Sequence, residues 1–157
     1  MLIYRIVHKS YSKELVASGL KGRWNSAGKK VIYCAESVAV AFLENMVRRQ
    51  GVGFNDDFKI MVIEIAADLK FTTITTDDLD DGWREFRDYS KCQPTGDEWY
   101  DAAKTAVLKV PSAVLPEAYN FVINSSHTDY KKIRLIEVID LVPDERLEDI
   151  LKKYRKK

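Results

Sequence analysis

The order of strand-forming segments constrains the fold of this chain more than any other feature of its sequence. Runs rich in β-branched and aromatic side chains occur at 2–7, 31–35, 58–66, 71–75 and 133–142, the last being the strongest. Two more extended segments lie at 107–115 and 119–124, and Pro111 and Pro116 limit the first of them to an edge or irregular strand. Strands therefore outnumber helices without regular alternation, which predicts an α+β domain.

Helical segments are expected at three places, besides a short polar and helical stretch that ends at Ser18. Ser37 is a suitable N-cap for a helix that carries apolar residues along one side and ends near Gly51. Thr95 and Glu98 have the spacing of a capping box, which predicts that a second helix starts there. Asp144 is expected to cap a closing helix that ends in the basic tail.

Length and charge restrict the kind of protein further. A chain of 157 residues is most simply one domain, here 1–157, built around a single core. The net charge of +1 offers no field that would attract nucleic acid or an anionic membrane surface, so neither is an expected partner. Arg5, His8 and Lys9 interrupt the apolar N-terminus before it reaches signal-peptide length, which predicts a cytoplasmic protein.

The sequence offers no motif for a bound metal or a resident dinucleotide. Cys34 and Cys92 lie 58 residues apart, and with only two histidines they cannot assemble a zinc site of the usual spacing. We expect both cysteines to be buried free thiols. The run 51–56 begins like a dinucleotide-binding fingerprint, but Asp56 stands where the third glycine belongs.

Three residues in the first third of the chain combine types that suit a binding site. Arg23, in the glycine-containing loop 19–30, could present a guanidinium fork to phosphates, although a loop arginine is usually just solvated. Tyr33 lies mid-strand, where an amphipathic core residue is the simpler explanation. Glu44 lies at the edge of the apolar helix face, and it either faces a groove or pairs with Arg48 one turn later.

The combination of these residues resembles the RES domain, the toxin half of a class of bacterial toxin–antitoxin pairs. The resemblance rests first on "GLKGRWNSAGKKVIYCAESVAVAFLE", with its loop arginine, strand tyrosine and helical glutamate. It continues through "GDEWYDAAKTAVLKVPSAVLPEAYNFVINSSH" and includes "IYRI" near the start and "DERL" near the end. Ser125 and Thr128 depart from the pattern, because the family commonly has proline at both places.

The resemblance implies a fold similar to that of ADP-ribosyltransferases, with a split, mixed or antiparallel sheet around an NAD cleft. It implies that NAD is a substrate and not a prosthetic group, and that cleavage releases nicotinamide. It also implies an Xre-like antitoxin as partner, and it leaves open whether the chain is a homo-oligomer within the toxin–antitoxin complex.

Family positions imply roles for single residues. Arg23, Tyr33 and Glu44 are expected to be catalytic. Arg5, Arg23, Tyr33 and Ser112 are expected to bind NAD, while Asn120 and Trp24 shape the walls of the site. Glu44 would stabilise the cation that develops on the ribose, and Tyr33 would stack against nicotinamide.

Other interpretations of the same residues remain open. The bond could be cleaved by water or by phosphate, which makes the chain an NAD glycohydrolase or phosphorylase. The same site could transfer ADP-ribose to a cellular protein. A non-enzymatic binding module, in which Glu44 merely pairs with Arg48, is the third class.

Overall fold

The computed structural model describes residues 1–50, 54–147 and 149–150. The strands are β1 (Leu2–His8), β2 (Val31–Ala35), β3 (Phe58–Ile65), β4 (Thr72–Thr73), β5 (Val107–Pro111), β6 (Tyr119–Asn124) and β7 (Ile133–Asp140). The α-helices are α1 (Val38–Arg48) and α2 (Gln93–Ala102), and short 3₁₀ turns occupy Lys9–Tyr11, Thr76–Asp78 and Thr128–Lys132.

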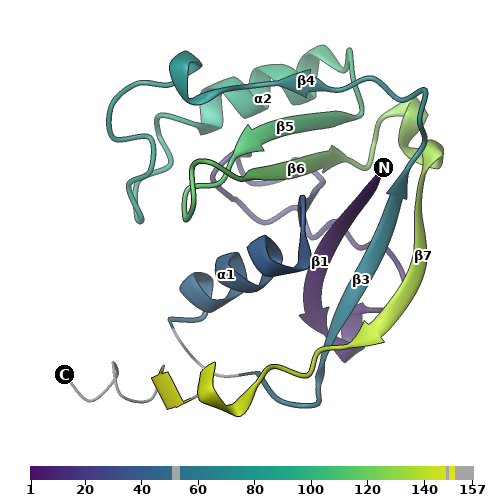
Figure 1. Ribbon diagram of the computed structural model, residues 1–157. Coiled ribbons are helices and arrows are strands. Elements are labelled where there is room, and N and C mark those ends of the chain that lie inside the picture. Colours follow the sequence, from purple (N-terminus) through teal and green to yellow (C-terminus); the bar gives the residue numbers. More distant parts are fainter. Residues whose placement is uncertain (51–53, 148, 151–157) are drawn as a thin grey trace.

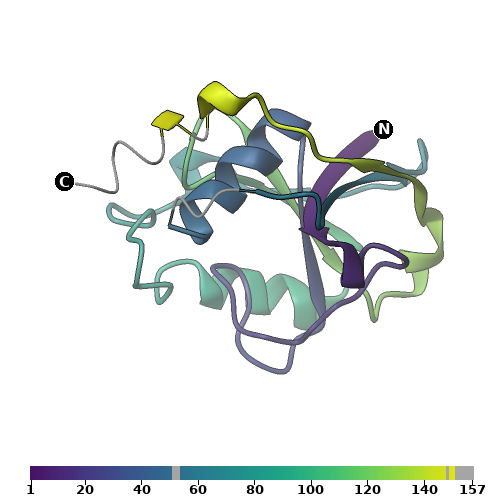
Figure 2. The same cartoon turned by 90° about the horizontal axis from the view of Figure 1, so that it is seen from below.

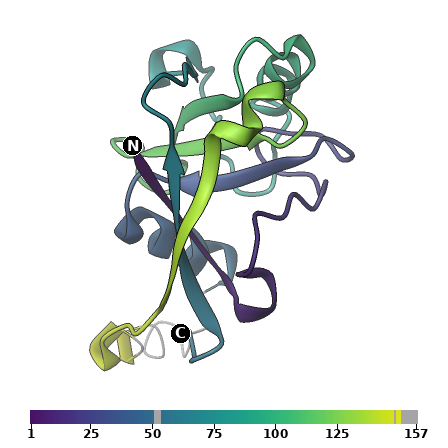
Figure 3. The same cartoon turned by 90° about the vertical axis from the view of Figure 1, so that its right-hand side faces the viewer.

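All seven strands belong to one mixed sheet that is almost divided in the middle. Their order is β4-β5-β6-β2-β1-β3-β7, and every neighbouring pair is antiparallel except β4 with β5. Strands β1 and β2 share the single registered pair Tyr4 and Ala35, whereas β1 pairs with β3 over its whole length. Figures 1 and 3 show the result, with β2, β5 and β6 running across the steep β1, β3 and β7. The predicted α+β class and split sheet are confirmed.

Helices α1 and α2 pack on the same face of the sheet, over different halves. Strand residues alternate between faces, and Tyr33 therefore lies on the face that carries its partner Val122. Trp99 of α2 is buried with Val122 and other residues of the β5-β6-β2 half. Val40 and Ala41 of α1 are buried with Ile6, Ala35 and Ile60, on the other half. Figure 1 shows α1 in the angle between the two halves.

The loop before β2 is fixed against α2, as Figure 2 shows from below. Gly96 makes this close approach possible, because a Cβ atom there would lie 1.9 Å from the main-chain oxygen of Trp24. Trp24 itself is buried, with 2% of its surface exposed. The predicted loop at 19–30 is confirmed, and α2 is its main support.

Several sequence expectations were confirmed close to the residue. Strand β2 has the predicted bounds, and the side chain of Ser37 accepts a hydrogen bond from the Val40 amide as the N-cap of α1. Both cysteines are buried free thiols. Asp144 accepts hydrogen bonds from Arg146, and residues 145–147 are helical. Helix α1 ends at Arg48 with Arg49 as its C-cap, shortly before the predicted end near Gly51, which like residues 151–157 lies outside the described residues.

Other expectations were wrong. Helix α2 begins at Gln93 and not at Thr95, because Pro94 already has the φ angle of a first helical turn. Strand β5 is not an edge strand, since Pro111 is its last residue and the strand pairs with β4 on one side and β6 on the other. The stretch up to Ser18 is helical only at Lys9–Tyr11, and the strand predicted at 71–75 is reduced to β4.

No helix among the described residues is long and apolar enough to cross a membrane.

Candidate active site

The carboxylate of Glu44 is held by two side chains from the β5-β6 hairpin. Ser112 Oγ donates to Glu44 Oε1 at 2.7 Å, and Asn120 Nδ2 donates to the same oxygen at 2.6 Å. Within the described residues Glu44 Oε2 accepts no hydrogen bond, yet it is not buried. The carboxylate is therefore oriented through one oxygen and presents the other to whatever occupies the site.

Ser112 has only one way to direct its hydroxyl proton. Its Oγ accepts hydrogen bonds from the amides of Val114 and Leu115, at 3.2 and 3.0 Å, and these fill its acceptor positions. The proton therefore goes to Glu44. The Ser112 residue is 1% exposed, and its amide donates to the Ala118 carbonyl at 2.9 Å, so the hairpin fixes its position.

The ion pair between Glu44 and Arg48 that helical spacing allows is not formed. The ion pairs between described residues, taken to 4.0 Å, include none between these two side chains. Neutral donors hold Glu44 instead. The structural explanation that the sequence offered for this glutamate therefore does not account for its position.

Tyr33 uses its hydroxyl to hold the loop before β2. Its Oη donates to Asn25 Oδ1 at 2.7 Å and accepts from the Trp24 amide at 2.9 Å. Burial raises the pKa of the Tyr33 phenol above its usual range, so the phenol stays protonated and remains a donor. A Cβ atom at Gly22 would lie 2.6 Å from Tyr33 Oη, so only glycine allows the loop to pass here.

Asn25 was not among the predicted site residues, although it is the centre of this loop. It is completely buried, and its Nδ2 donates to the carbonyls of Leu20 and Ser26 at 2.9 and 3.1 Å. Its Oδ1 accepts a hydrogen bond from the hydroxyl of Tyr33. The sequence signals for it were its place directly after Trp24 in a glycine-containing loop, which many solvated turns share, and the loop motif on which the family resemblance rests.

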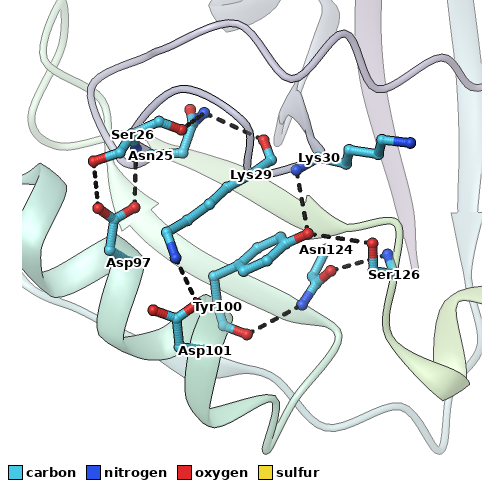
Figure 4. A network of polar contacts seen from close by, with 9 residues as sticks. All are labelled: Asn25, Ser26, Lys29, Lys30, Asp97, Tyr100, Asp101, Asn124 and Ser126. Carbon is cyan, nitrogen blue, oxygen red and sulfur yellow. Dashed lines mark hydrogen bonds and ion pairs between the residues drawn. The ribbon is translucent and has the colours of Figure 1, made fainter.

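A network of polar contacts joins the same loop to α2 and to the end of β6 (Figure 4). Asp97 accepts from the amide of Ser26 at 2.9 Å and also from its hydroxyl. The Lys30 amide donates to Tyr100 Oη at 3.2 Å, and that hydroxyl donates to Ser126 Oγ at 3.2 Å. These hydrogen bonds join the loop that carries Arg23 to α2, and they join α2 to the residues that follow β6.

Arg23 directs both terminal nitrogens at main-chain carbonyls. Its Nη1 donates to the carbonyl of Trp83, and its Nη2 donates to that of Glu85 at 3.1 Å. Its guanidinium also lies over the ring of Tyr89, 5.0 Å from the centroid. The arginine predicted to grip phosphates therefore fastens the segment that faces its loop, and its phosphate contact stays a prediction.

Arg5 lies where the two halves of the sheet separate. Its Nη1 donates to the Tyr33 carbonyl at 2.8 Å, which links β1 to β2 beyond their one registered pair. Burial lowers the pKa of the Arg5 guanidinium, and the nearby charge of Arg48 lowers it further. Two of the predicted site residues, Arg5 and Tyr33, thus meet directly, as do Glu44 and Ser112.

A protein-family model with the description "RES domain" matches residues 2–148, which is nearly the whole chain. The chain is a RES-domain protein. It is 30% identical over 135 residues to "Toxin Res" of Yersinia enterocolitica, covering 83% of this chain and 88% of that protein. It is 31% identical over 139 residues to the "Prs ADP-ribosylating toxin" of a Sphingobium species, covering 85% of this chain and 86% of that one.

The RES-domain fold is also similar to a solved structure. The crystal structure of the M. tuberculosis MbcT-MbcA toxin-antitoxin complex contains a chain that matches with a TM-score of 0.69. The match covers 99% of this chain and 89% of that one, at 18% sequence identity. At that identity the match concerns the fold alone.

Proposed function

We propose that this RES-domain protein is the toxin of a toxin–antitoxin pair, and that it consumes NAD by cleaving the bond between nicotinamide and ribose. Relatives that carry the name toxin support the first part. The observation that carries the second is the carboxylate of Glu44, fixed through Oε1 by Ser112 and Asn120 while Oε2 is left without a partner among the described residues.

Cleavage of NAD passes through a state with positive charge on the ribose. The bond from C1′ to the pyridinium nitrogen breaks, its electron pair leaves with nicotinamide, and an oxocarbenium-like sugar remains. Glu44 Oε2 accepts a hydrogen bond from a ribose hydroxyl and places negative charge beside that cation. A water molecule then forms the new bond to C1′, and its proton passes to Glu44 or to solvent. The products are nicotinamide and ADP-ribose.

The neighbouring residues prepare this carboxylate for the reaction. Ser112 and Asn120 are neutral donors, so they fix Glu44 without cancelling its charge. Tyr33 supplies a ring for stacking against the cationic nicotinamide, and its hydroxyl is already committed to the loop. Arg5, Arg23 and Ser112 complete the predicted NAD contacts.

The substitution Glu44→Gln tests the role of the carboxylate. The glutamine oxygen can still accept from Ser112 and Asn120, so we expect the free energy of unfolding to change by no more than about 1 kcal/mol. The negative charge is lost, so kcat for nicotinamide release is expected to fall by about 10²–10³ while the affinity for NAD changes little. Nicotinamide is measured by chromatography and NAD binding by calorimetry.

Glu137→Gln is the matched control for that experiment. It makes the same chemical change at an exposed position of the edge strand β7, so its kcat should equal that of the unmodified chain. A folded Glu44→Gln variant with near-normal kcat would contradict the assigned role of Glu44. Comparing products with and without inorganic phosphate distinguishes hydrolysis from phosphorolysis.

Transfer of ADP-ribose to a protein is the second candidate function. The Sphingobium relative, named for ADP-ribosylating activity, favours it. In that reaction a nucleophile of the target protein replaces water at C1′, and nicotinamide still leaves. Mass spectrometry of a lysate incubated with NAD would then find ADP-ribose attached to a protein, and little free ADP-ribose would accumulate.

An Xre-like antitoxin is the proposed partner, since a chain that depletes NAD in its own cell must be held inactive. The similar solved structure is that of a toxin-antitoxin complex, which is consistent with such a partner. We expect the chain to co-purify with the product of a neighbouring gene. High-yield expression of the active chain alone in healthy cells would count against this proposal.

A further inference from the structure

A cavity of about 420 Å³ opens at the C-terminal end of α1, apart from the contacts of Glu44. Its polar and aromatic lining consists of His8, Tyr11, Asn45, Arg48, Arg49 and Phe58. The volume falls within the range that small-molecule sites in proteins show. The cavity lies between α1, the end of β1 and the start of β3.

The lining is positively charged and contains no acidic residue among the described residues that form it. Arg48 is exposed, and the ion pairs of the described residues include none that involves it. The nearby carboxylate of Asp57 is bound by Lys9 Nζ at 2.6 Å and lies 4.0 Å from Nε2 of the lining residue His8, so it contacts that end of the cavity and not Arg48. An anion would therefore meet Arg48 with its full charge available.

Aromatic rings provide the remaining walls. Tyr11 is 62% exposed, which leaves its ring free for stacking, and Phe58 lies edge-on to His8 with 5.8 Å between ring centroids. The guanidinium of Arg49 covers Phe58, 4.0 Å from its centroid, and stiffens that wall. Rings beside a guanidinium suit a ligand that joins a flat base to a phosphate.

The position of Arg48 connects the cavity to the candidate active site. Glu44 and Arg48 are four residues apart, so their side chains leave the same side of α1 about one turn, roughly 5.4 Å, from each other. On the other side Arg48 is close enough to Arg5 to lower the pKa of that guanidinium. Arg48 therefore places a positive charge between Glu44 and the cavity, which favours the phosphates of a bound ligand at this point.

We propose that this cavity binds the adenosine 5′-phosphate half of the dinucleotide, with Arg48 on the phosphates and the base stacked against Tyr11. The identity of the ligand rests on the proposed cleavage of NAD. In NAD the phosphates are joined to the nicotinamide ribose through one methylene group. A dinucleotide with that ribose at Glu44 therefore extends along α1 past Arg48 and into the cavity. Arg48 is a binding residue for the half of NAD that does not react.

Adenosine 5′-monophosphate is the probe, because its binding does not depend on turnover. Calorimetry on the full chain should detect its binding, and Arg48→Gln should weaken it about tenfold or more through loss of a charge-assisted contact. Tyr11→Ala should weaken it as well. Both positions are exposed, so neither change should disturb folding. Arg134→Gln on β7 removes a guanidinium from a surface ion pair with Glu64 of β3, and it should leave binding unchanged.

Several results would overturn the proposal. One is that adenosine 5′-monophosphate does not bind, and another is that Arg48→Gln binds it as tightly as the unmodified chain does. The proposal would also fail if Arg134→Gln lost as much affinity as Arg48→Gln, or if inorganic phosphate bound as tightly as the nucleotide. An unchanged KM for NAD in Arg48→Gln, beside normal cleavage, would also refute it while leaving the proposed function intact. Conversely, Arg48-dependent binding of the monophosphate by a chain that cleaves no NAD would refute the proposed function and support the nucleotide site.

Discussion

Replacing Tyr33 by phenylalanine tests whether a single hydroxyl holds the loop that carries Arg23. The change keeps the ring and removes Oη, which leaves the Trp24 amide without its acceptor and Asn25 Oδ1 without its donor. Asn25 is completely buried, so water does not replace the lost contact without rearrangement of the loop. Each unsatisfied group costs about 1–3 kcal/mol, and allowing for partial relaxation we expect a loss of about 2–4 kcal/mol.

The assay for Tyr33→Phe is urea denaturation followed by circular dichroism, with thermal melting as a second measurement. For a domain of this size the expected loss corresponds to a decrease in Tm of about 4–16 °C. Tyr11→Phe is the matched control. Its ring is 62% exposed and makes no hydrogen bond through Oη among the described residues, so its free energy of unfolding should change by less than about 0.5 kcal/mol.

The difference in stability between the unmodified chain and Tyr33→Phe should also depend on pH. Because the folded-state pKa of Tyr33 is raised above 10.0, the phenol contributes its full stabilisation below that pH. The contribution is lost as the pH rises from 10.0 towards the raised value, so the difference between tyrosine and phenylalanine should narrow in alkali. A loss below about 0.5 kcal/mol at neutral pH, or a difference that grows in alkali, would refute the reasoning.

Two further substitutions test how the loop is supported. Gly96→Ala would place a Cβ atom 1.9 Å from the Trp24 carbonyl oxygen, so the free energy of unfolding measured in urea should fall by about 3 kcal/mol or more. Helix propensity alone would favour alanine by about 1 kcal/mol. A stabilised variant would therefore contradict this account of the close packing. Arg23→Ala removes the hydrogen bonds to the carbonyls of Trp83 and Glu85. Limited proteolysis should then cut the segment 83–89 faster, and KM for NAD should rise. An unchanged rate of proteolysis would show that these hydrogen bonds do not hold the segment in place.

Local features were predictable from the sequence because they depend on neighbouring residues. The β-branched run at 31–35 specifies β2, and the hydroxyl of Ser37 caps α1 through an amide three residues later. Pro94 shows the limit of such rules. The capping-box spacing at Thr95 was present, but the proline already favoured an earlier helix start.

The contacts of the predicted site residues were only partly foreseeable. Residue types and local structure made Arg23, Tyr33 and Glu44 candidates one by one, and the family resemblance joined them into one site and added Arg5 and Ser112. Nothing in the sequence indicated that Arg23 would be bound to loop carbonyls, or that Asn120, predicted only as part of a wall, would hold the carboxylate of Glu44. Helical spacing also suggested Arg48 as a partner of Glu44, and the structure places Arg48 in the lining of the cavity at the C-terminal end of α1 instead.

By itself the sequence determined the elements, the α+β class and the residue types available for chemistry, because propensity, capping and hydrophobic pattern act over a few residues. Only the tertiary structure decided which atoms meet. Ser112 and Asn120 reach Glu44 across 68 and 76 residues of chain, through a strand order that no local signal encodes. That packing also leaves Glu44 Oε2 without a hydrogen-bond donor among the described residues, since a carboxylate is oriented by the donors that surround it in space and not by its neighbours along the chain.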